Sequence, residues 1–325
     1  MDPNTAMETI GAGAKAATKL GEIVEKVFGP RWTRKQADAD AYSDQRKLQT
    51  IRENPDMEIV YVNGQINARE RSPEALAYRA RQRLLTDAIR EESNIENVLE
   101  AASKELQQVE SVSDEPVDDD WITRFFSKAK DVSNEEMHFI WGRILAGEVQ
   151  KPGSFSLRTL DIISNLTQKE AEAFQSYLPY IMVDSGVNAY ITSEKAVTEK
   201  YKIDGSNLFK LDACGLLQVI PFSEFNVRIS PNEAVRRFYT RNQLLVIENK
   251  TSGVIETRIN NIYLLTEAGK ELFNLLAPEP NDPYFTDWVE QIYSQAPKGN
   301  LKYTIHSKIP DKEKEYFAEP TVIFE

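Results

Sequence analysis

The sequence predicts a mainly α-helical protein with a smaller α+β part. Apolar residues recur at helical spacing through most of the first half of the chain, and capping residues or Gly-Pro pairs mark the helix ends. Short segments with the composition of β-strands are concentrated in the second half. With 325 residues, of which 41% are hydrophobic, the chain is long enough to bury a separate core in each of two or three domains.

The N-terminal segment, residues 1–30, is predicted to carry one amphipathic helix over residues 5–28. Asn4 is a candidate N-cap, and Gly29-Pro30 is a strong stop signal. Lysines and glutamates gather on one side of this helix, opposite a face of apolar and small residues. The residues that we assign to this candidate membrane and oligomerisation face are Ile10, Gly13, Ala17, Leu20, Gly21, Val24 and Phe28.

Gly13, Ala17 and Gly21 form a row of small residues at four-residue spacing within this helix. An interior glycine costs a helix about 1 kcal/mol relative to alanine, so the row calls for a reason. Such rows let helix backbones approach closely, especially in lipid. One copy is too charged to cross a bilayer, whereas several copies could turn their charged faces to a water-filled lumen. The alternative is an amphipathic helix that packs on its own protein or frays.

Residues 31–110 are predicted as a charged helical region, with long helices over 33–54 and 72–110. A short strand and turn, or a linker, separates them near residues 57–64. The arginines of this region are interleaved with acidic residues. This pattern favours a solvated helix face over a phosphate-binding patch.

Residues 118–175 are predicted to form a compact helical unit. Three consecutive acids, Asp118 to Asp120, begin its first helix, and we interpret them as helix-capping groups rather than as a metal site. A capping box from Ser133 opens a second helix, and another from Thr167 opens a later one. The core residues that we single out in this unit are Trp121, Phe125, Trp141, Leu145, Pro152 and Leu157.

The same stretch, residues 118–174, contains the runs WGRILAGE and KPGSFSLRTL after a tryptophan and a Glu-Glu-Met. These runs resemble the signature of a family of uncharacterised bacterial proteins, which implies a fold and no established chemistry. His138 stands where that family's pattern has glutamine, and we interpret it as an exposed helix residue. More distantly, the Ala/Gly-rich N-terminal helix ahead of charged helices looks like the Abi-alpha abortive-infection proteins, which are associated with phage defence.

Residues 176–277 are predicted to form an α+β domain. Two short helices at 193–201 and 205–213 precede strands at 217–222, 226–229, 243–248 and 257–264, and we expect the last two strands to pair across a turn at 251–253. The order resembles a winged-helix domain. Its candidate recognition helix carries only Lys210 as a cation, so protein binding is favoured over DNA binding.

Residues 278–325 form an aromatic-rich C-terminal tail, in which 303–305 and 321–324 are candidate partner strands. Exposed aromatic side chains on such an appendage would suit recognition of a partner. The alternative is that they close the core of the preceding domain. The candidate partner-binding residues are Tyr284, Phe285, Trp288 and Tyr293.

The net charge and the residue composition argue against several classes of function. The net charge is −12, and acids outnumber bases in each of the segments 1–110, 111–180 and 181–325, so we expect no nucleic-acid partner. Two histidines, one cysteine and no catalytic or metal-binding motif predict a protein that is not an enzyme and holds no cofactor or metal. The absence of a long apolar run and of a signal peptide predicts a cytoplasmic protein.

These observations lead to two hypotheses for function. In the first, the chain is a phage-defence effector of the abortive-infection type. Its C-terminal half senses a phage protein, such as an oligomeric structural component, and the N-terminal helices of a homo-oligomer then disrupt the inner membrane. In the second, it is a winged-helix regulator or protein-interaction adaptor without membrane activity.

Overall fold

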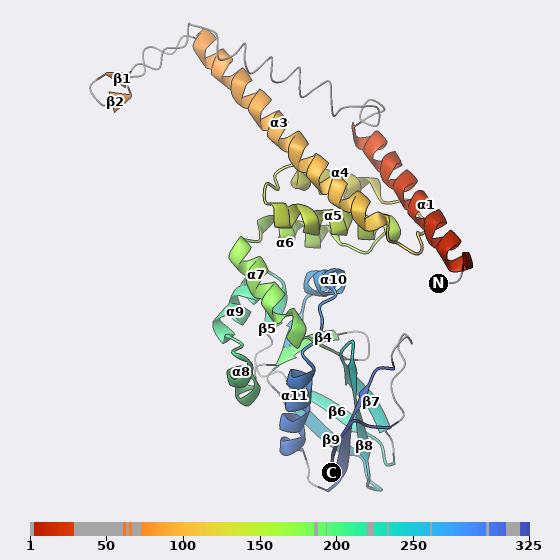
Figure 1. The fold of residues 1–325 in the computed structure, drawn as a ribbon. Coiled ribbons are helices and arrows are strands. Elements are labelled where there is room, and N and C mark those ends of the chain that lie inside the picture. Colours follow the sequence, from red (N-terminus) through yellow and green to blue (C-terminus); the bar gives the residue numbers. More distant parts are fainter. Residues whose placement is uncertain are drawn as a thin grey trace. The chain divides into compact units, whose positions relative to one another are not determined.

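The computed structural model divides the chain into two compact units, Met1–Leu157 and Arg158–Glu325 (Figure 1). Helices make up most of the described residues of the first unit, and an antiparallel sheet with helices makes up the second. The prediction of a mainly helical protein with a smaller α+β part is confirmed at this level. The predicted helix at 33–54 lies outside the described residues, which are 3–28, 61–62, 65–66, 73–184, 188–192, 194–219, 224–232, 234–260, 262–296, 299–309 and 319–325.

The first unit is built from long helices with capped N-termini. Asp118 accepts a hydrogen bond from the Trp121 amide at 2.8 Å and is the N-cap of the first helix of the 118–175 segment, as predicted. The predicted capping box at Ser133 is wrong by one residue, because the N-cap of the next helix is Asn134, which accepts from the Glu136 amide at 2.8 Å. The elements described in this unit are α1 (Pro3–Phe28), the hairpin β1 (Tyr61–Val62) and β2 (Gln65–Ile66), α3 (Pro73–Leu106), α4 (Asp119–Ala129) and α5 (Glu135–Gln150).

The core of the first unit is centred on α3 and α5. A Cβ atom at Gly142 would lie only 2.4 Å from the Cβ of Ala101, so this close approach of the two helices requires glycine. The Trp121 ring stacks on Phe125 with centroids 5.0 Å apart, and Phe125 lies 5.2 Å from Trp141. The predicted aromatic core of the 118–175 segment is therefore present on α4 and α5.

The second unit begins with helices and continues into a sheet. Its described helices are α6 (Leu157–Asn165), α7 (Gln168–Tyr177), the 3-10 helix η1 (Leu178–Tyr180), α8 (Lys195–Tyr201), α9 (Gly205–Ala213), α10 (Glu267–Leu276) and α11 (Asp282–Gln295). Its described strands are β3 (Met182–Asp184), β4 (Asn188–Thr192), β5 (Leu217–Val219), β6 (Glu224–Ile229), β7 (Ala234–Tyr239), β8 (Gln243–Asn249), β9 (Ile255–Asn260), β10 (Ile262–Leu265), β11 (Leu301–Ser307) and β12 (Val322–Phe324).

Eight of these strands form one antiparallel sheet in the order β12-β11-β8-β7-β3-β4-β10-β5, and β6 pairs separately with β9. The predicted pairing of 257–264 with 243–248 is wrong. Both edges of β8 are occupied, by β7 and by β11, so β9 pairs with β6 and β10 pairs with β4 and β5. The predicted pairing of the last two strands is confirmed, with Tyr303 opposite Phe324.

Candidate functional site

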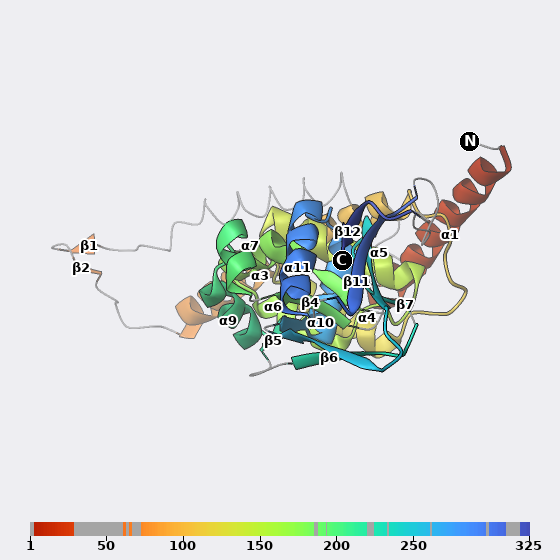
Figure 2. The same ribbon diagram turned by 90° about the horizontal axis from the view of Figure 1, so that it is seen from below.

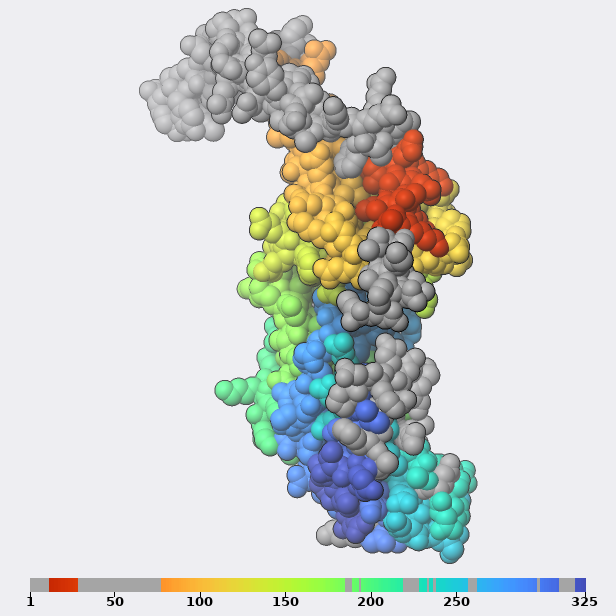
Figure 3. All heavy atoms as spheres, turned by 45° about the vertical axis from the view of Figure 1, so that its right-hand side comes forward, coloured from red at the N-terminus to blue at the C-terminus, as the bar shows by residue number. Residues whose placement is uncertain are grey.

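Helix α1 lies against α3, α4 and α5 of the first unit through one aliphatic face, and Figure 3 shows its atoms in red beside those of α3 in orange. The buried side chains of this face are Ala16, Leu20, Ile23 and Val24. Phe28 adds an edge-on contact to Phe126, with ring centroids 5.1 Å apart. Since a fully buried aliphatic side chain contributes roughly 1.5–3 kcal/mol, this face holds the helix on its unit. Among residues 12–28, the other positions of α1 are half-buried or exposed.

Three lysines of α1 reach the segment that connects α3 to α4 or the first residue of α4. Lys15 pairs with Asp114, and Lys26 pairs with Asp119. Lys19 donates to the backbone carbonyl oxygens of Glu115 at 2.6 Å and Ser113 at 3.3 Å. We call these contacts the lysine tether.

The lysine tether is exposed to solvent. Its three lysines line an open groove of about 380 Å³ between α1 and the 113–122 segment, together with Ser113 and Asp114. The hydrogen bond from Lys15 lowers the pKa of the Asp114 carboxyl, whose side chain is 94% exposed. Burial, followed by repulsion from Lys15, lowers the pKa of the Lys19 ammonium group. Exposed ion pairs of this kind are weak and screened by salt, so the tether is reversible.

The predicted small-residue row is not the face that α1 buries. Leu20 and Val24 are buried, Gly13, Gly21 and Phe28 are half-buried, and Ala17 is exposed. A Cβ atom at Gly21 would meet no described atom within 4 Å, and one at Gly13 would make ordinary contact at 3.5 Å. The packing of α1 on the described residues therefore does not require either glycine. The side chain of Ile10 lies outside the described residues.

The family signature builds a loop after α5. The buried Glu148 carboxylate accepts hydrogen bonds from the amides of Gly153 at 2.6 Å and Phe155 at 3.0 Å. Trp121 Nε1 donates to the Phe155 carbonyl oxygen at 2.7 Å, which joins the loop to α4. A Cβ atom at Gly147 would lie 2.8 Å from the Phe155 ring. These contacts give the AGE and KPGSF runs a structural role.

The predicted core residues of this segment have the positions that such a role requires. Trp121, Phe125, Trp141 and Leu145 are buried, while Pro152 and Leu157 are half-buried beside the loop. Glu148 was not among the predicted core residues. The signal that could have identified it is a carboxylate inside an otherwise apolar helix stripe. The interpretation of His138 as exposed is wrong. It is 7% exposed, and its Nε2 donates to the Val132 carbonyl oxygen at 2.6 Å because the end of α4 turns back toward α5.

The candidate partner-binding aromatics lie on α11 and are mainly core residues. Tyr284, Phe285 and Trp288 are buried, and Tyr293 is half-buried, with its ring 5.4 Å from that of Tyr303. Figure 2 shows α11 beside β11. The expectation of an exposed aromatic appendage is wrong, because these side chains recur at helical spacing and pack on the sheet. The alternative, that they close the core, describes their positions.

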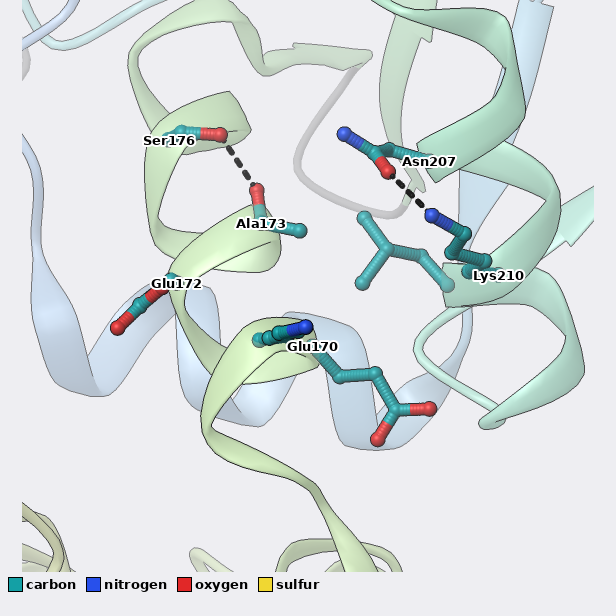
Figure 4. A pocket seen from close by; sticks show the side chains of 8 residues that line it. Glu170, Glu172, Ala173, Ser176, Asn207 and Lys210 are labelled. Carbon is teal, nitrogen blue, oxygen red and sulfur yellow. Dashed lines mark hydrogen bonds between the residues drawn. The ribbon is translucent and has the colours of Figure 1, made fainter.

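A second groove, of about 370 Å³, lies between α7 and α9 (Figure 4). Basic and acidic side chains both line it, Lys169 and Lys210 with Glu170 and Glu172. Lys210 donates to Asn207 Oδ1 at 3.0 Å across one wall. This mixture of charges selects neither an anionic nor a cationic ligand.

Groups able to perform metal chemistry do not gather in the described part of the chain. Among the residues that the structure describes, no three His, Cys, Asp or Glu side chains lie together as a metal site. Cys214 is half-buried, and burial raises the pKa of its thiol. No described helix combines the length and the apolar character needed to cross a membrane.

Comparison with known proteins places the two units in one family. A family model described as "Protein of unknown function (DUF2806)" matches residues 78–289. The match begins within α3 and ends within α11, so α1 lies outside it. No curated protein and no solved structure matches the chain. The resemblance to an uncharacterised conserved family is thereby confirmed, and the chain belongs to the DUF2806 family of proteins of unknown function.

Proposed function

We propose that this chain is a non-enzymatic effector of phage defence, of the abortive-infection type, in which α1 is the acting element. At rest in the cytoplasm, α1 is held on the first unit. When the C-terminal half binds a phage protein, such as an oligomeric structural component, the copies gather and α1 is released. The released helices then assemble through Gly13, Ala17 and Gly21 and disrupt the inner membrane.

The observation that carries this proposal is the mismatch between the two faces of α1. The buried face is aliphatic, whereas Ala17 of the small-residue row is exposed and Gly21 has open space around it among the described residues. Glycine in a helix interior costs about 1 kcal/mol, and packing on the first unit does not require it. A second packed state of α1, in which backbones approach closely, would give these glycines a role.

The way α1 is attached also supports its release. Only one face is buried, and the polar contacts are the exposed lysine tether, which water and salt reach. The aliphatic face that becomes free is the face that a membrane would cover. The lysines and glutamates on the other side are too many for one helix in hydrocarbon, which is why the proposal needs several copies.

The partner-sensing role is proposed for the second unit. Helices α8 and α9 lie between β4 and β5 in sequence, and β4, β10 and β5 are neighbours in that order in the sheet. This succession is the one that a winged-helix domain uses, with β6 to β9 as a long insertion. On α9, Phe209 is 58% exposed and Lys210 is the only cation. This surface favours a protein partner over DNA.

The decisive experiment compares two full-length variants in a vesicle-leakage assay and in cells. Ala17→Glu adds a charge to the small-residue row at a site that is exposed at rest, so the resting fold stays intact. Thr18→Glu adds the same charge at an equally exposed position outside the row and serves as the matched control. We expect Ala17→Glu to abolish leakage and killing, and Thr18→Glu to retain most of both.

A third variant tests release without changing α1. Asp114→Lys reverses one end of the lysine tether, and we expect it to increase leakage several-fold. Glu290→Lys, an exposed change of equal charge on α11, is its control. Leakage and killing that persist in Ala17→Glu at the level of the unchanged chain would rule out assembly through the small-residue row, and the absence of leakage from every variant and from the unchanged chain would rule out the membrane action.

A second candidate function is a winged-helix regulator or protein-interaction adaptor without membrane activity. The neighbouring order of β4, β10 and β5 favours it, because that part of the second unit is complete without α1. An adaptor predicts no leakage in any variant and loss of partner binding in Phe209→Ala. DNA retention that weakens steeply with salt would instead indicate a regulator.

A further inference from the structure

Helix α3 is buried along only part of its length. In its C-terminal half, Ile95, Val98, Leu99, Ala102 and Leu106 form the apolar stripe that packs in the core of the first unit. In its N-terminal half, from 77 to 90, none of the residues is buried. Figure 1 shows this half running on beyond α4 and α5.

The apolar stripe is interrupted by Glu91 and Glu92 where burial stops. It resumes toward the N-terminus at the same helical spacing, with Arg81 among the apolar residues Ala77, Tyr78, Leu84, Leu85, Ala88 and Ile89. Leu84 is 70% exposed and Ile89 is 37% exposed. An isolated helix of this length is marginal in water, and most helices of its kind are stabilised by packing of their apolar face. The stripe thus presents a packing surface that no described residue covers.

The charges along α3 indicate what covers it. Residues 77–84 contain three arginines, Arg79, Arg81 and Arg83, and no acid, for a net charge of +3. Residues 85–96 contain four acids and Arg90, and 1 − 4 gives a net charge of −3. A second α3 in the parallel direction would place like charges together, whereas an antiparallel one would place each arginine end beside an acidic end.

We propose that two copies of this chain pair through the N-terminal halves of α3, antiparallel and with two-fold symmetry. The stripe is self-complementary about a centre between residues 86 and 87. There, Leu85 of each copy lies opposite Ala88 of the other, and Arg81 lies opposite Glu92. The same surface is used on both copies, as a closed dimer requires.

This pairing is independent of the proposed membrane action. It uses α3, which lies almost wholly within the family match of 78–289, and does not involve α1, which lies outside it. A dimer can form whether or not α1 is ever released. Either proposal can therefore be disproved without affecting the other.

The first test measures the mass of the full chain in solution by sedimentation over a range of concentrations. We expect a dimer for the unchanged chain. Leu84→Glu places a charge in the stripe at an exposed position and should weaken the dimer at least ten-fold. Thr86→Glu, an equal charge at an exposed position outside the stripe, should leave it unchanged. A chain that is monomeric at all concentrations, as it would be if another part of the same chain covered the stripe, overturns the proposal.

The second test reads the direction of pairing. Leu85→Cys and Ala88→Cys are each introduced into full chains in which Cys214→Ala has removed the single native cysteine. An antiparallel pair predicts that a mixture of the two variants forms disulfide-linked dimers faster than either variant alone. Faster linking of each variant to itself would indicate parallel pairing and would overturn the proposed arrangement.

Discussion

Helices α1 and α11 are held on their units in different ways. Helix α11 is integrated into the second unit through five buried side chains, Tyr284, Phe285, Trp288, Val289 and Ile292. Over residues 12–28, helix α1 is attached through four buried aliphatic side chains and through exposed lysines. An aromatic helix face buries far more area than an aliphatic one, so the difference lies in how much free energy holds each helix.

This contrast bears on function as well as on packing. A helix that moves in a functional transition must come from the weakly held part of a protein. By that criterion α1 is a candidate for release and α11 is not.

Truncation of the α11 core should destabilise the second unit strongly. Trp288 is fully buried, with its ring 5.2 Å from Phe238, so Trp288→Ala leaves a large cavity and should cost about 3–5 kcal/mol of unfolding free energy. Urea unfolding followed by circular dichroism measures it. Trp288→Phe is the control. It keeps most of the ring and removes an indole N–H that has no hydrogen-bond partner among the described residues, so its cost should be much smaller.

Truncation of the α1 face should act locally. Leu20→Ala should cost about 2 kcal/mol, at the low end for a buried leucine because the site lies at the edge of its unit. We expect faster hydrogen exchange of the α1 amides, measured by mass spectrometry, and little change in α4 and α5. Thr18→Ala, at an exposed position, should change neither. Equally faster hydrogen exchange throughout the first unit would mean that α1 is part of the core and is held as firmly as α11.

Replacement of a glycine in α1 should stabilise the docked helix, whereas the truncation of Leu20 should destabilise it. Gly21→Ala meets no described atom within 4 Å of the new Cβ, so it should stabilise docked α1 by up to about 1 kcal/mol through helix propensity alone. Slower exchange of the α1 amides would report it. Gly142→Ala is the matched comparison in α5. There the added Cβ would lie 2.4 Å from that of Ala101, and we expect destabilisation instead.

Local signals made parts of this structure predictable. Gly29-Pro30 predicted the end of α1 at Phe28, and Asp118 marks the observed start of α4. The predicted caps Asn4 and Ser133 were each one residue from the observed boundary, since α1 begins at Pro3 and Asn134 caps α5. Interactions between distant residues left little local signal. One edge of β8 is occupied by β7, which directly precedes it, and the other by the distant β11, so the strand that follows β8 pairs with β6 instead.

The expectation that the aromatic side chains of α11 are exposed was wrong for a different reason. Asn281 caps this helix and accepts a hydrogen bond from the Tyr284 amide at 3.0 Å, and the buried aromatics that follow recur at helical spacing. The signal for a buried helix was therefore present in the sequence. In α1 the helix itself was predictable, but which of its faces is buried depends on the shape of α3 and α4, and the apolar pattern alone did not distinguish Ala16 from Ala17.

The smallest expected effect is the pH dependence of the lysine tether. Lys15 lowers the pKa of Asp114 in the docked state, so the contribution of this carboxylate is present above its ordinary pKa of 3.8 and is lost as the pH falls through the lowered value. Burial lowers the pKa of Lys19. This shift changes the stability of docked α1 only at alkaline pH, so it does not contribute to the change expected in acid.

Protection of the α1 amides, corrected for intrinsic exchange, should therefore fall slightly as the pH is lowered below about 4. Other carboxylates also titrate in this range, so the informative quantity is the difference from Asp114→Asn, which cannot be protonated there. The two proteins should differ near neutral pH and converge in acid. A constant difference across the range would mean that Asp114 affects α1 through loop geometry and not through its charge.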